Sequence, residues 1–394
     1  MKILFLASRM PFPPDRGDRL RAFNIIRTLR SAGHEIDLAT FASSETERRV
    51  AEELKPFCNK LVLVELSPLA SLLSCGAALL GGRSLQSAHY KSKKMHDAVG
   101  ALLGSVKFDV VYVHLFRMAQ YVPRSGPEYT IVDFTDVISR EIERSLPYRR
   151  GLNRMIYSIE LPRVRSFERS VARSFRECWV VSDSEAGFLR EMCPSANVKV
   201  VPNGVDLKEF RPQNGEGSNV VSFVGHLGVP HNVDAVLHFY RDIFPLVLEQ
   251  CPACKFQITG PSAHRSLLPL KNDDRILMTG FVKDLNETLG KSSVFVAPLR
   301  YCAGLQNKVL EAMAAGVPVV ATPCVNEGLD AKDGEEIFLA SEPREFAEKV
   351  VSILKDTTFR NRVSASARGF VERRFSWKHV AERMAAIELE IGSR

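Results

Sequence analysis

Residues 304–322 read G-L-Q-N-K-V-L-E-A-M-A-A-G-V-P-V-V-A-T, and this stretch is the most informative about the fold of the chain. Small and apolar residues recur through 309–315, which predicts a helix of about two turns. Gly316 and Pro318 then end it. The apolar run at 317–321 is typical of a parallel strand buried on both faces. A polar turn, a short helix and a buried strand in this order indicate an α/β protein.

The same stretch carries the groups that a nucleoside diphosphate requires. Glu311 is the one carboxylate near the start of the predicted helix, and Asn307 and Lys308 stand just before it. A carboxylate accepts hydrogen bonds from ribose hydroxyls, and a lysine and free amides at a helix entrance attract phosphates. Two alternatives stay open: Glu311 as an acid that only stabilises the helix dipole, and Lys308 as an ordinary surface lysine.

Strand-like and helix-like runs alternate along the chain, and the pattern restarts once. In the first half, strands are predicted at 3–7, 36–40, 61–66, 110–114, 130–134, 178–182 and 198–201, with a helix at 21–32. In the second half, strands are predicted at 220–224, 256–259, 276–279 and 294–297, with helices at 233–244 and 377–391. Such alternation predicts parallel sheets with crossover helices.

The length of 394 residues favours two domains, because single hydrophobic cores stop growing near ~250–300 residues. We predict an N-terminal domain over 1–205 and a C-terminal domain over 206–375, joined near 202–219. A last helix, 376–394, is predicted to pack back towards the first domain. Two such domains would face each other across a cleft at the carboxyl ends of their strands, where open α/β sheets bind ligands.

Composition indicates the cellular compartment in which the protein is expected. Eight cysteines without framework spacing indicate a reducing compartment, the cytoplasm. The C-P-A-C at 251–254 has no second pair, so we interpret it as a turn rather than a zinc or redox site. No acid cluster has metal-ligand spacing, and no secretory signal precedes the first strand. The apolar run 66–80 falls short of the ~20 residues that a spanning helix needs.

The net charge of +7 is modest, and no basic stripe with interleaved aromatics indicates nucleic-acid binding. Four basic residues, Arg83, Lys91, Lys93 and Lys94, stand beside the apolar run 66–80. Two interpretations remain for 66–94: a solvated face, or a peripheral contact with the anionic surface of the inner membrane.

Several motifs in this order resemble the retaining glycosyltransferases of family 4, over nearly the whole length. They are G-H at 33–34, D-V-V-Y-V-H at 109–114, V-V-S-D-S-E at 180–185, V-P-N-G-V-D at 201–206, F-V-G-H-L at 223–227 and K-V-L-E-A-M-A-A-G-V-P-V-V-A-T at 308–322. A closer likeness, to sugar transferases of PEP-CTERM/exosortase exopolysaccharide systems, is carried by M-P-F-P-P-D-R-G-D at 10–18, M-A-Q-Y-V at 118–122, D-F-T-D-V-I-S at 133–139 and P-H-N-V-D-A-V at 230–236.

The resemblance implies the GT-B architecture, in which two Rossmann-like domains face across a cleft. It implies metal-independent transfer with retention, from a nucleoside-diphosphate sugar to a hydroxyl of a glycan or lipid-linked acceptor, without a cofactor. Two alternatives stay open. A GT-B sugar-nucleotide epimerase would need no acceptor, and a non-catalytic GT-B protein would only bind glycan or partner proteins.

Glu311 matches the second of two family glutamates spaced by seven residues, the one implied to hold the ribose hydroxyls. The first would fall at Ala303, whose methyl group cannot contact the donor sugar. The backbone amides of Gly304, Leu305 and Gln306 are the predicted substitutes.

The family also places an arginine and a lysine on the diphosphate. Here the loop after the first strand of the second domain reads Gly225, His226, Leu227, so the arginine is missing and Lys308 is the best remaining cation. His226 is a weaker candidate because a histidine with an ordinary pKa is mostly neutral at pH 7, although it can donate a hydrogen bond.

The first domain supplies the acceptor-side candidates. Gly17, in the loop after the first strand, would let the backbone approach a sugar or phosphate. Arg19 is predicted either to bind a phosphate or to be a surface charge at a helix start. His114 ends a strand and matches the family histidine that faces donor and acceptor; its alternative is a capped structural histidine. Asp136 follows the next strand, as an active-site acid or a turn aspartate.

Overall fold

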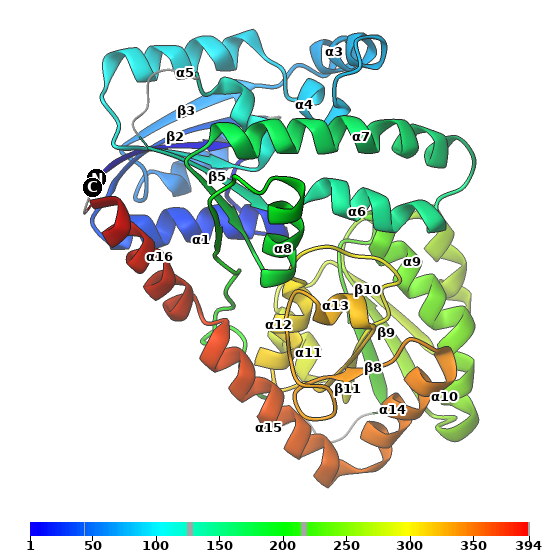
Figure 1. The fold of residues 1–394 in the computed structure, drawn as a ribbon. Coiled ribbons are helices and arrows are strands. Elements are labelled where there is room, and N and C mark those ends of the chain that lie inside the picture. Colours follow the sequence, from blue (N-terminus) through cyan, green and yellow to red (C-terminus); the bar gives the residue numbers. More distant parts are fainter. Residues whose placement is uncertain (43, 124–128, 214–218, 393–394) are drawn as a thin grey trace. The chain divides into compact units, whose positions relative to one another are not determined.

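The computed structural model describes residues 1–42, 44–123, 129–213 and 219–392, and side chains through 385. The chain divides into two compact units, Met1–Val201 and Pro202–Arg394. Each is an α/β unit with a parallel sheet, which confirms the predicted fold class (Figure 1). The predicted linker 202–219 lies partly outside the described residues, and the packing of helix 376–394 towards the first domain stays a prediction.

The first unit has, over its described residues, a seven-stranded sheet in the order β3-β2-β1-β4-β5-β6-β7, and every neighbouring pair is parallel. Its strands are β1 Lys2–Ala7, β2 Glu35–Ala42, β3 Lys60–Glu65, β4 Val110–His114, β5 Thr130–Thr135, β6 Glu177–Val180 and β7 Val198–Val200. Its helices are α1 Gly17–Ser31, α2 Glu45–Val50, α3 Pro68–Leu80, α4 Leu85–His89, α5 Lys93–Ser105, α6 Ile138–Ser145, α7 Gly151–Ser174 and α8 Asp183–Met192, with short 3-10 turns η1 Ala51–Leu54, η2 Phe116–Tyr121 and η3 Leu146–Tyr148.

Both faces of this sheet are buried, as its apolar strands predict. Side chains alternate along a strand, so β1 contributes to two faces. Leu4 and Leu6 join the core that α5, α7 and α8 cover. Phe5 points to the other face and stacks on Tyr112 of β4, with 4.7 Å between ring centroids. The strand order reverses between β1 and β4, which makes their carboxyl ends the expected place for a ligand.

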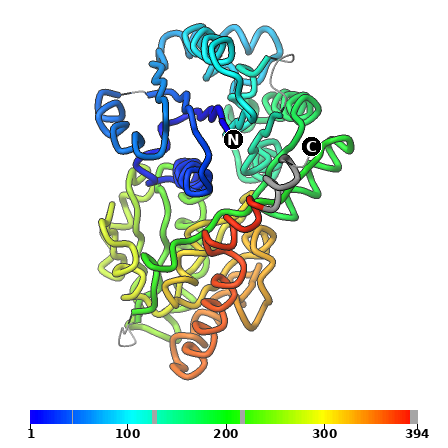
Figure 2. Tube along the Cα trace, turned by 90° about the vertical axis from the view of Figure 1, so that its left-hand side faces the viewer, coloured from blue at the N-terminus to red at the C-terminus, as the bar shows by residue number. Residues whose placement is uncertain are grey.

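The second unit has, within its described residues, a six-stranded parallel sheet in the order β10-β9-β8-β11-β12-β13. Its strands are β8 Val220–Val224, β9 Lys255–Thr259, β10 Ile276–Gly280, β11 Val294–Ala297, β12 Val319–Ala321 and β13 Phe338–Leu339. Its helices are α9 Pro230–His238, α10 Phe244–Gln250, α11 Leu285–Gly290, α12 Asn307–Ala314, α13 Pro323–Asn326, α14 Pro343–Lys355, α15 Thr357–Arg374 and α16 Trp377–Gly392, with η4 Phe239–Ile243 and η5 Arg265–Asn272. Figure 2 traces α15 and α16 as successive orange and red helices.

The stretch 304–322 forms the predicted helix and strand. β12 is fully buried, and Gly316 follows α12 with a φ of 74°, a left-handed conformation that suits glycine. One detail of the prediction was wrong. α12 already begins at Asn307, so Asn307 and Lys308 lie in its first turn and Glu311 lies at its centre. The amide and ammonium groups are therefore held by the helix itself.

The single helix predicted at 233–244 was also wrong. α9 ends at His238, a π-helical turn follows over Phe239–Ile243, and α10 begins at Phe244. Pro245 is the second residue of α10 and has no backbone N–H, so it cannot donate the hydrogen bond to Arg241 that a continuous α-helix requires. The predicted turn at 251–254 is present, and Cys251 and Cys254 are free thiols.

Candidate functional site

Lys308 is a buried cation at the start of α12. Its side chain is only 9% exposed, so the surface-lysine interpretation was wrong. Its Nζ donates a hydrogen bond to Oδ1 of Asn232 in α9 and lies 5.1 Å from the ring centroid of Phe223 in β8. Burial lowers the pKa of Lys308 to about 8, although Cys302 and Glu311 favour the charged form.

Glu311 lies three residues after Lys308, so both groups emerge from the same side of α12. Burial, together with the charge of Glu209, raises the pKa of Glu311 to about 7, and Lys308 opposes this shift. The side chain still has partial contact with solvent. A partly desolvated carboxylate close to a buried ammonium matches the pair that the sequence predicted for a ribose and a diphosphate.

The loop after β8 approaches the rest of the second unit closely. A Cβ on Gly225 would lie 2.9 Å from Cγ of Asn232, and a Cβ on Gly260 would lie 1.8 Å from the carbonyl oxygen of Gly225. Asn232 Nδ2 donates to the carbonyl oxygen of His226 at 3.1 Å, and Nδ1 of His226 accepts from the amide of Gly228 at 3.2 Å. A neutral imidazole that accepts at Nδ1 carries its proton on Nε2 and can donate there.

Asn232 therefore connects the two predicted donor segments. Its side-chain amide holds the loop that contains His226, and its oxygen holds the Lys308 ammonium. The sequence pattern did not assign it a role, because 76 residues separate it from Lys308 and only the fold brings them together.

The turn that leads into α12 is tightly constrained. Gly304 has a φ of 63°, and a Cβ on Gly328 would lie 2.1 Å from the carbonyl oxygen of Gly304. Nε2 of Gln306 donates to the carbonyl oxygen of Ala303 at 3.0 Å. Ala303 and Leu305 are buried, and Oδ1 of Asn307 accepts from Nδ2 of Asn203 at 2.9 Å. If the backbone amides of residues 304–306 bind the donor sugar, the backbone has to be held in place, and these contacts hold it.

The first unit has its own concentration of polar groups, at the carboxyl ends of the neighbouring strands β1, β4 and β5. Four buried polar atoms there have no hydrogen-bond partner among the described residues: Ser8 Oγ after β1, His114 Nε2 at the end of β4, Arg117 Nε in η2 and Asp136 Oδ1 after β5. Buried polar atoms are normally paired, so this arrangement is suited to a ligand rich in hydroxyl groups.

His114 is buried at 3% exposure, and this burial lowers its pKa to about 4 despite the nearby carboxylates Asp133 and Asp18. The imidazole is therefore neutral at pH 7. Burial raises the pKa of Asp136 well above its ordinary value, and the charges of Glu185 and Glu141 add to this shift. Both groups thus combine a perturbed pKa with a position at the ligand-binding edge of the sheet, a combination typical of functional sites.

A buried ion pair supports this edge. Nε and Nη2 of Arg21 in α1 donate to the Asp133 carboxylate at 2.7 and 3.0 Å, and the Tyr112 hydroxyl donates to it at 2.6 Å. Burial alone would raise the pKa of Asp133, but the Arg21 guanidinium outweighs it and holds the pKa below its ordinary value. The sequence pattern gave no sign of this network, whose ion pair spans 112 residues.

The backbone at the same edge is strained. Leu115 follows β4 with a φ of 68°, and Thr135 ends β5 with a φ of 62°. Neither residue favours this conformation, which costs on the order of 1–3 kcal/mol at each position and is concentrated at ligand-binding sites. The strain turns the chain directly after His114 and directly before Asp136.

Two acceptor-side predictions need revision. Gly17 does not lie in the loop after β1 but is the exposed first residue of α1. Arg19 belongs to the same helix, and its guanidinium pairs with Glu47 and with Asp15. A role for Arg19 in binding phosphate stays a prediction, and it would require these pairs to be exchanged.

Within the part of the chain that the structure describes, no cluster of three or more His, Cys, Asp or Glu side chains is arranged to hold a metal ion. Nor does any helix in the same described ranges have the length and hydropathy needed to cross a bilayer.

Comparison with known proteins adds to this geometry. Residues 218–356 match the family described as glycosyl transferases group 1. Relatives include an uncharacterised 44.6 kDa protein in the cps region of Klebsiella pneumoniae, 21% identical over 96% of this chain and 97% of its own. The Vi polysaccharide biosynthesis protein VipC/TviE of Salmonella typhi is 29% identical over 34% of this chain and 25% of its own.

Two solved structures have the same fold over almost the whole chain. Sucrose-phosphate synthase from Thermosynechococcus elongatus has a TM-score of 0.78 at 16% identity, covering 100% of this chain and 99% of its own. HepE of Anabaena, solved in complex with UDP and glucose, has a TM-score of 0.67 at 15% identity, covering 98% and 99%.

These structural likenesses define the fold as GT-B, with two Rossmann-like parallel-sheet units. The family match over 218–356 shows that most of the second unit is similar to the group 1 glycosyl transferases, and one relative is named for polysaccharide biosynthesis.

Proposed function

We propose that the protein is a retaining, metal-independent hexosyltransferase of family 4. It moves a sugar from a nucleoside-diphosphate sugar to a hydroxyl of a glycan or lipid-linked acceptor during exopolysaccharide synthesis, in a system of the PEP-CTERM/exosortase type. The observation that carries the proposal is the buried Lys308 ammonium in the first turn of α12, with the Glu311 carboxylate on the same side of that helix. The solved complex of HepE with UDP and glucose supports the donor class.

The second unit binds the donor in this proposal. Glu311 accepts hydrogen bonds from the ribose hydroxyls, and Lys308 with the amides at the start of α12 neutralises the diphosphate. Because Ala303 stands where the family has a glutamate, the amides of residues 304–306 bind the donor sugar instead. His226 adds a hydrogen-bond donor from Nε2.

The chemical step follows from these contacts. The acceptor oxygen bonds to the anomeric carbon on the face that the diphosphate leaves, and the bond between that carbon and the phosphate oxygen breaks. The acceptor proton passes to an oxygen of the leaving diphosphate, so the enzyme needs no separate base. Lys308 and the helix dipole stabilise the charge that develops on the leaving group.

The first unit binds the acceptor. A neutral His114 can exchange hydrogen bonds with an acceptor hydroxyl at Nε2, and Asp136 and Ser8 provide further unpaired polar atoms at the same sheet edge. A lipid-linked acceptor would be met at the cytoplasmic face of the inner membrane, with residues 66–94 in peripheral contact with it.

One observation favours a second candidate function. The glutamate expected at position 303 is replaced by a buried alanine, as in a site without catalysis that only binds glycan or partner proteins. The alternative of a sugar-nucleotide epimerase differs from both, because it turns over its donor without an acceptor.

The test is an incubation with UDP-, GDP-, ADP- and dTDP-sugars, with a membrane extract as acceptor source and release of nucleoside diphosphate as the readout. We expect release with at least one donor, dependent on the extract, and a loss of more than tenfold in Glu311→Ala. Glu348→Ala, an exposed acid of α14, is the matched control and should retain full activity. Release without extract would indicate a hydrolysing epimerase, and an altered sugar nucleotide without release would indicate an isomerising one. No release, with every donor recovered unchanged, would indicate the non-catalytic protein.

A further inference from the structure

The first unit exposes an unusual amount of apolar surface on two neighbouring helices. Eleven large hydrophobic side chains are exposed among the described residues, and nine of them lie within 69–80 or 148–159. The nine are Leu69, Leu72, Leu73, Leu79, Leu80, Tyr148, Leu152, Met155 and Ile159, with Leu80 at 94% exposure. Exposed apolar residues gathered in this way mark an interaction site.

The two helices form one continuous surface. Nη2 of Arg163 in α7 donates to the carbonyl oxygen of Leu79 in α3 at 3.0 Å. Oε1 of Glu160 in α7 accepts from Ser84 Oγ at 2.9 Å and from the amide of Leu85 at 2.7 Å, which fixes α4 between them. Figure 1 shows α3 and α4 above α7 at the upper right. We call the exposed side chains of 66–94 and 144–159 the α3–α7 surface.

α3 has no charged residue and is apolar for most of its length, yet only Ser71 and Ala78 are buried in the unit. A helix that is apolar all round normally lies inside a protein or in lipid. Its 13 residues cannot cross a bilayer, so it can only lie in the interface.

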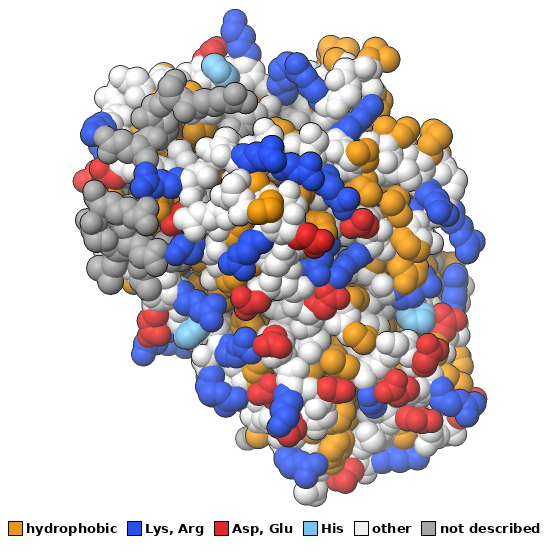
Figure 3. Space-filling model, viewed as in Figure 1, with side chains coloured by type: hydrophobic (Ala, Val, Ile, Leu, Met, Phe, Trp, Pro, Cys, Tyr) orange, Lys and Arg blue, Asp and Glu red, His pale blue; other side chains and the backbone are white. Residues whose placement is uncertain are grey.

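The charge of the protein is concentrated on the same surface. Residues 66–96 and 144–159 contain no acid and eight basic side chains: Arg83, Lys91, Lys93, Lys94, Arg144, Arg149, Arg150 and Arg154. Taking these eight from the 53 basic residues leaves 45, against 46 acids in the rest of the chain. The whole positive excess of the sequence therefore falls within the two segments that carry the nine exposed hydrophobic residues. Figure 3 shows orange and blue side chains interspersed over this region.

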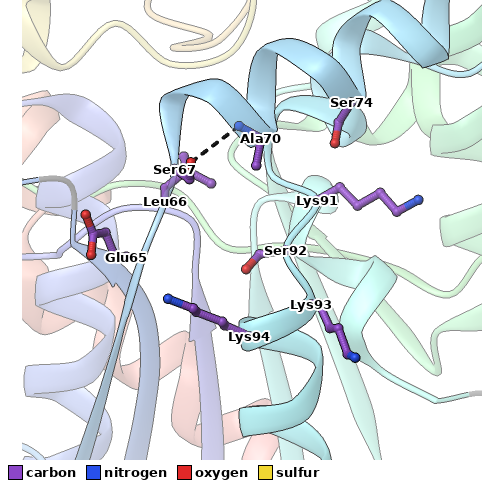
Figure 4. A pocket seen from close by; sticks show the side chains of 9 residues that line it. All are labelled: Glu65, Leu66, Ser67, Ala70, Ser74, Lys91, Ser92, Lys93 and Lys94. Carbon is purple, nitrogen blue, oxygen red and sulfur yellow. Dashed lines mark hydrogen bonds between the residues drawn. The ribbon is translucent and has the colours of Figure 1, made fainter.

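A pocket of about 350 Å³ lies at the edge of the α3–α7 surface. Three lysines, Lys91, Lys93 and Lys94, line it together with Leu66, Ser67, Ala70, Ser74, Ser92 and one acid, Glu65. The Glu65 carboxylate is paired with Nη2 of Arg48 at 3.2 Å, outside the pocket lining. The close-up in Figure 4 shows Lys91 beside Ser74, and Lys94 extending towards the end of β3. Three ammonium groups around a cavity beside an apolar helix fit the phosphate of a lipid headgroup whose chains meet the leucines.

We propose that the α3–α7 surface binds an anionic lipid bilayer, with α3 and the first turns of α7 in the interface and a headgroup phosphate in the lysine-lined pocket. Charge complementarity selects this occupant, since an anionic bilayer offers countercharge to the eight basic side chains of these segments and a purely apolar partner offers none. The inference extends the membrane contact of the proposed function from 66–94 to α7. It requires no catalysis, because a bilayer would be bound whether or not a sugar is transferred.

The experiment is sedimentation of the full-length protein with vesicles of phosphatidylglycerol and phosphatidylcholine, against pure phosphatidylcholine, without any sugar nucleotide. We expect binding to the anionic vesicles at least tenfold tighter than to the neutral ones, and weaker at high salt. Leu72→Ser with Leu73→Ser should reduce binding to both vesicle types by more than tenfold. Lys91→Gln with Lys93→Gln and Lys94→Gln should remove most of the preference for anionic vesicles.

The matched control is Leu268→Ser with Phe281→Ser, which removes the two large hydrophobic side chains that are exposed among the described residues of the second unit. This variant should bind like the wild type. Circular dichroism of every variant checks that it is folded. No binding of the wild type to anionic vesicles at low salt overturns the proposal. It is equally overturned if the wild type self-associates in sedimentation velocity through Leu72 and Leu73 and ignores vesicles. Because nucleoside diphosphate release is assayed separately, a failed vesicle test leaves the proposed transferase activity intact.

Discussion

The affinity for nucleoside diphosphate should depend on pH in a way that Lys308 and Glu311 determine separately. Lys308 has a pKa of about 8, so its charged fraction falls from about 90% at pH 7 to about 10% at pH 9. In the proposed donor site, diphosphate binding requires the charged form of Lys308. We therefore expect the dissociation constant to rise about tenfold between pH 7 and pH 9.

Glu311 acts in the opposite direction at lower pH. Its pKa of about 7 means that the carboxylate is about 10% populated at pH 6 and about 90% at pH 8. In the proposed donor site, this is the form that accepts from both ribose hydroxyls. Affinity should therefore be greatest between pH 7 and 8 and decline on both sides. The full loss of either charge-assisted contact corresponds to about 1.5–3 kcal/mol, or roughly 10- to 150-fold in affinity.

Isothermal titration calorimetry from pH 6 to 9.5 at constant ionic strength measures this curve, with whichever of UDP, GDP, ADP or dTDP binds tightest. Lys308→Met should remove the decline above pH 8, and Glu311→Gln the decline below pH 7. Lys308→Arg is the matched control, because arginine stays charged and should keep its affinity at pH 9. The reasoning is refuted if Lys308→Met binds as tightly as the wild type at pH 7, or if its decline above pH 8 persists.

Two predictions concern stability. Asp133→Asn leaves the Arg21 guanidinium buried without its counter-ion and should lower the unfolding free energy of the first unit by about 3 kcal/mol. Urea denaturation, followed by the fluorescence of Trp179 in a Trp377→Phe background, measures this loss. A loss of less than about 1 kcal/mol would contradict the ion-pair account. The pKa of Asp133 is lowered in the folded state, so its contribution is present above the ordinary value near 3.8 and should disappear as the pH falls below it. Gly260→Ala would place a methyl group 1.8 Å from the Gly225 carbonyl oxygen and should weaken nucleotide binding and destabilise the second unit by more than about 2 kcal/mol. Gly76→Ala, in an open position of α3, should instead stabilise the protein by up to about 1 kcal/mol. Equal shifts of the melting temperature in Gly76→Ala and Gly260→Ala would contradict the close packing at Gly260.

Periodicity and turn residues predicted most of the fold. The apolar run at 317–321 appears as the fully buried β12, and His114 ends β4 where the strand pattern placed it. Such features depend on local sequence, because burial on both faces and strand ends leave a mark in the order of neighbouring residues. The π-helical turn between α9 and α10 has no signal in the apolar pattern, which continues through Pro245; only the missing N–H of that proline indicates it.

The candidate site was only partly predictable, because its chemistry depends on contacts between distant segments. Lys308 and Glu311 were visible as residues, but their burial and shifted pKa values arise from the packing of α12 against α9 and β8. Asn232 and the pair formed by Arg21 and Asp133 have no local signal at all. A residue type alone indicates which chemistry is possible, and tertiary packing selects the residues that can perform it.

Both sheets are contiguous in sequence, and this has a consequence for synthesis. Every strand of the first sheet is complete by Val200, before β8 begins at Val220. Domains fold as units during translation, and at about 5–20 residues per second the synthesis of the 193 residues of the second unit takes roughly 10–40 s. During that interval the first unit can already fold and present its leucines and lysines. If the proposed bilayer contact holds, the nascent chain could thus be recruited to the bilayer before the second unit, the proposed donor-binding half, exists.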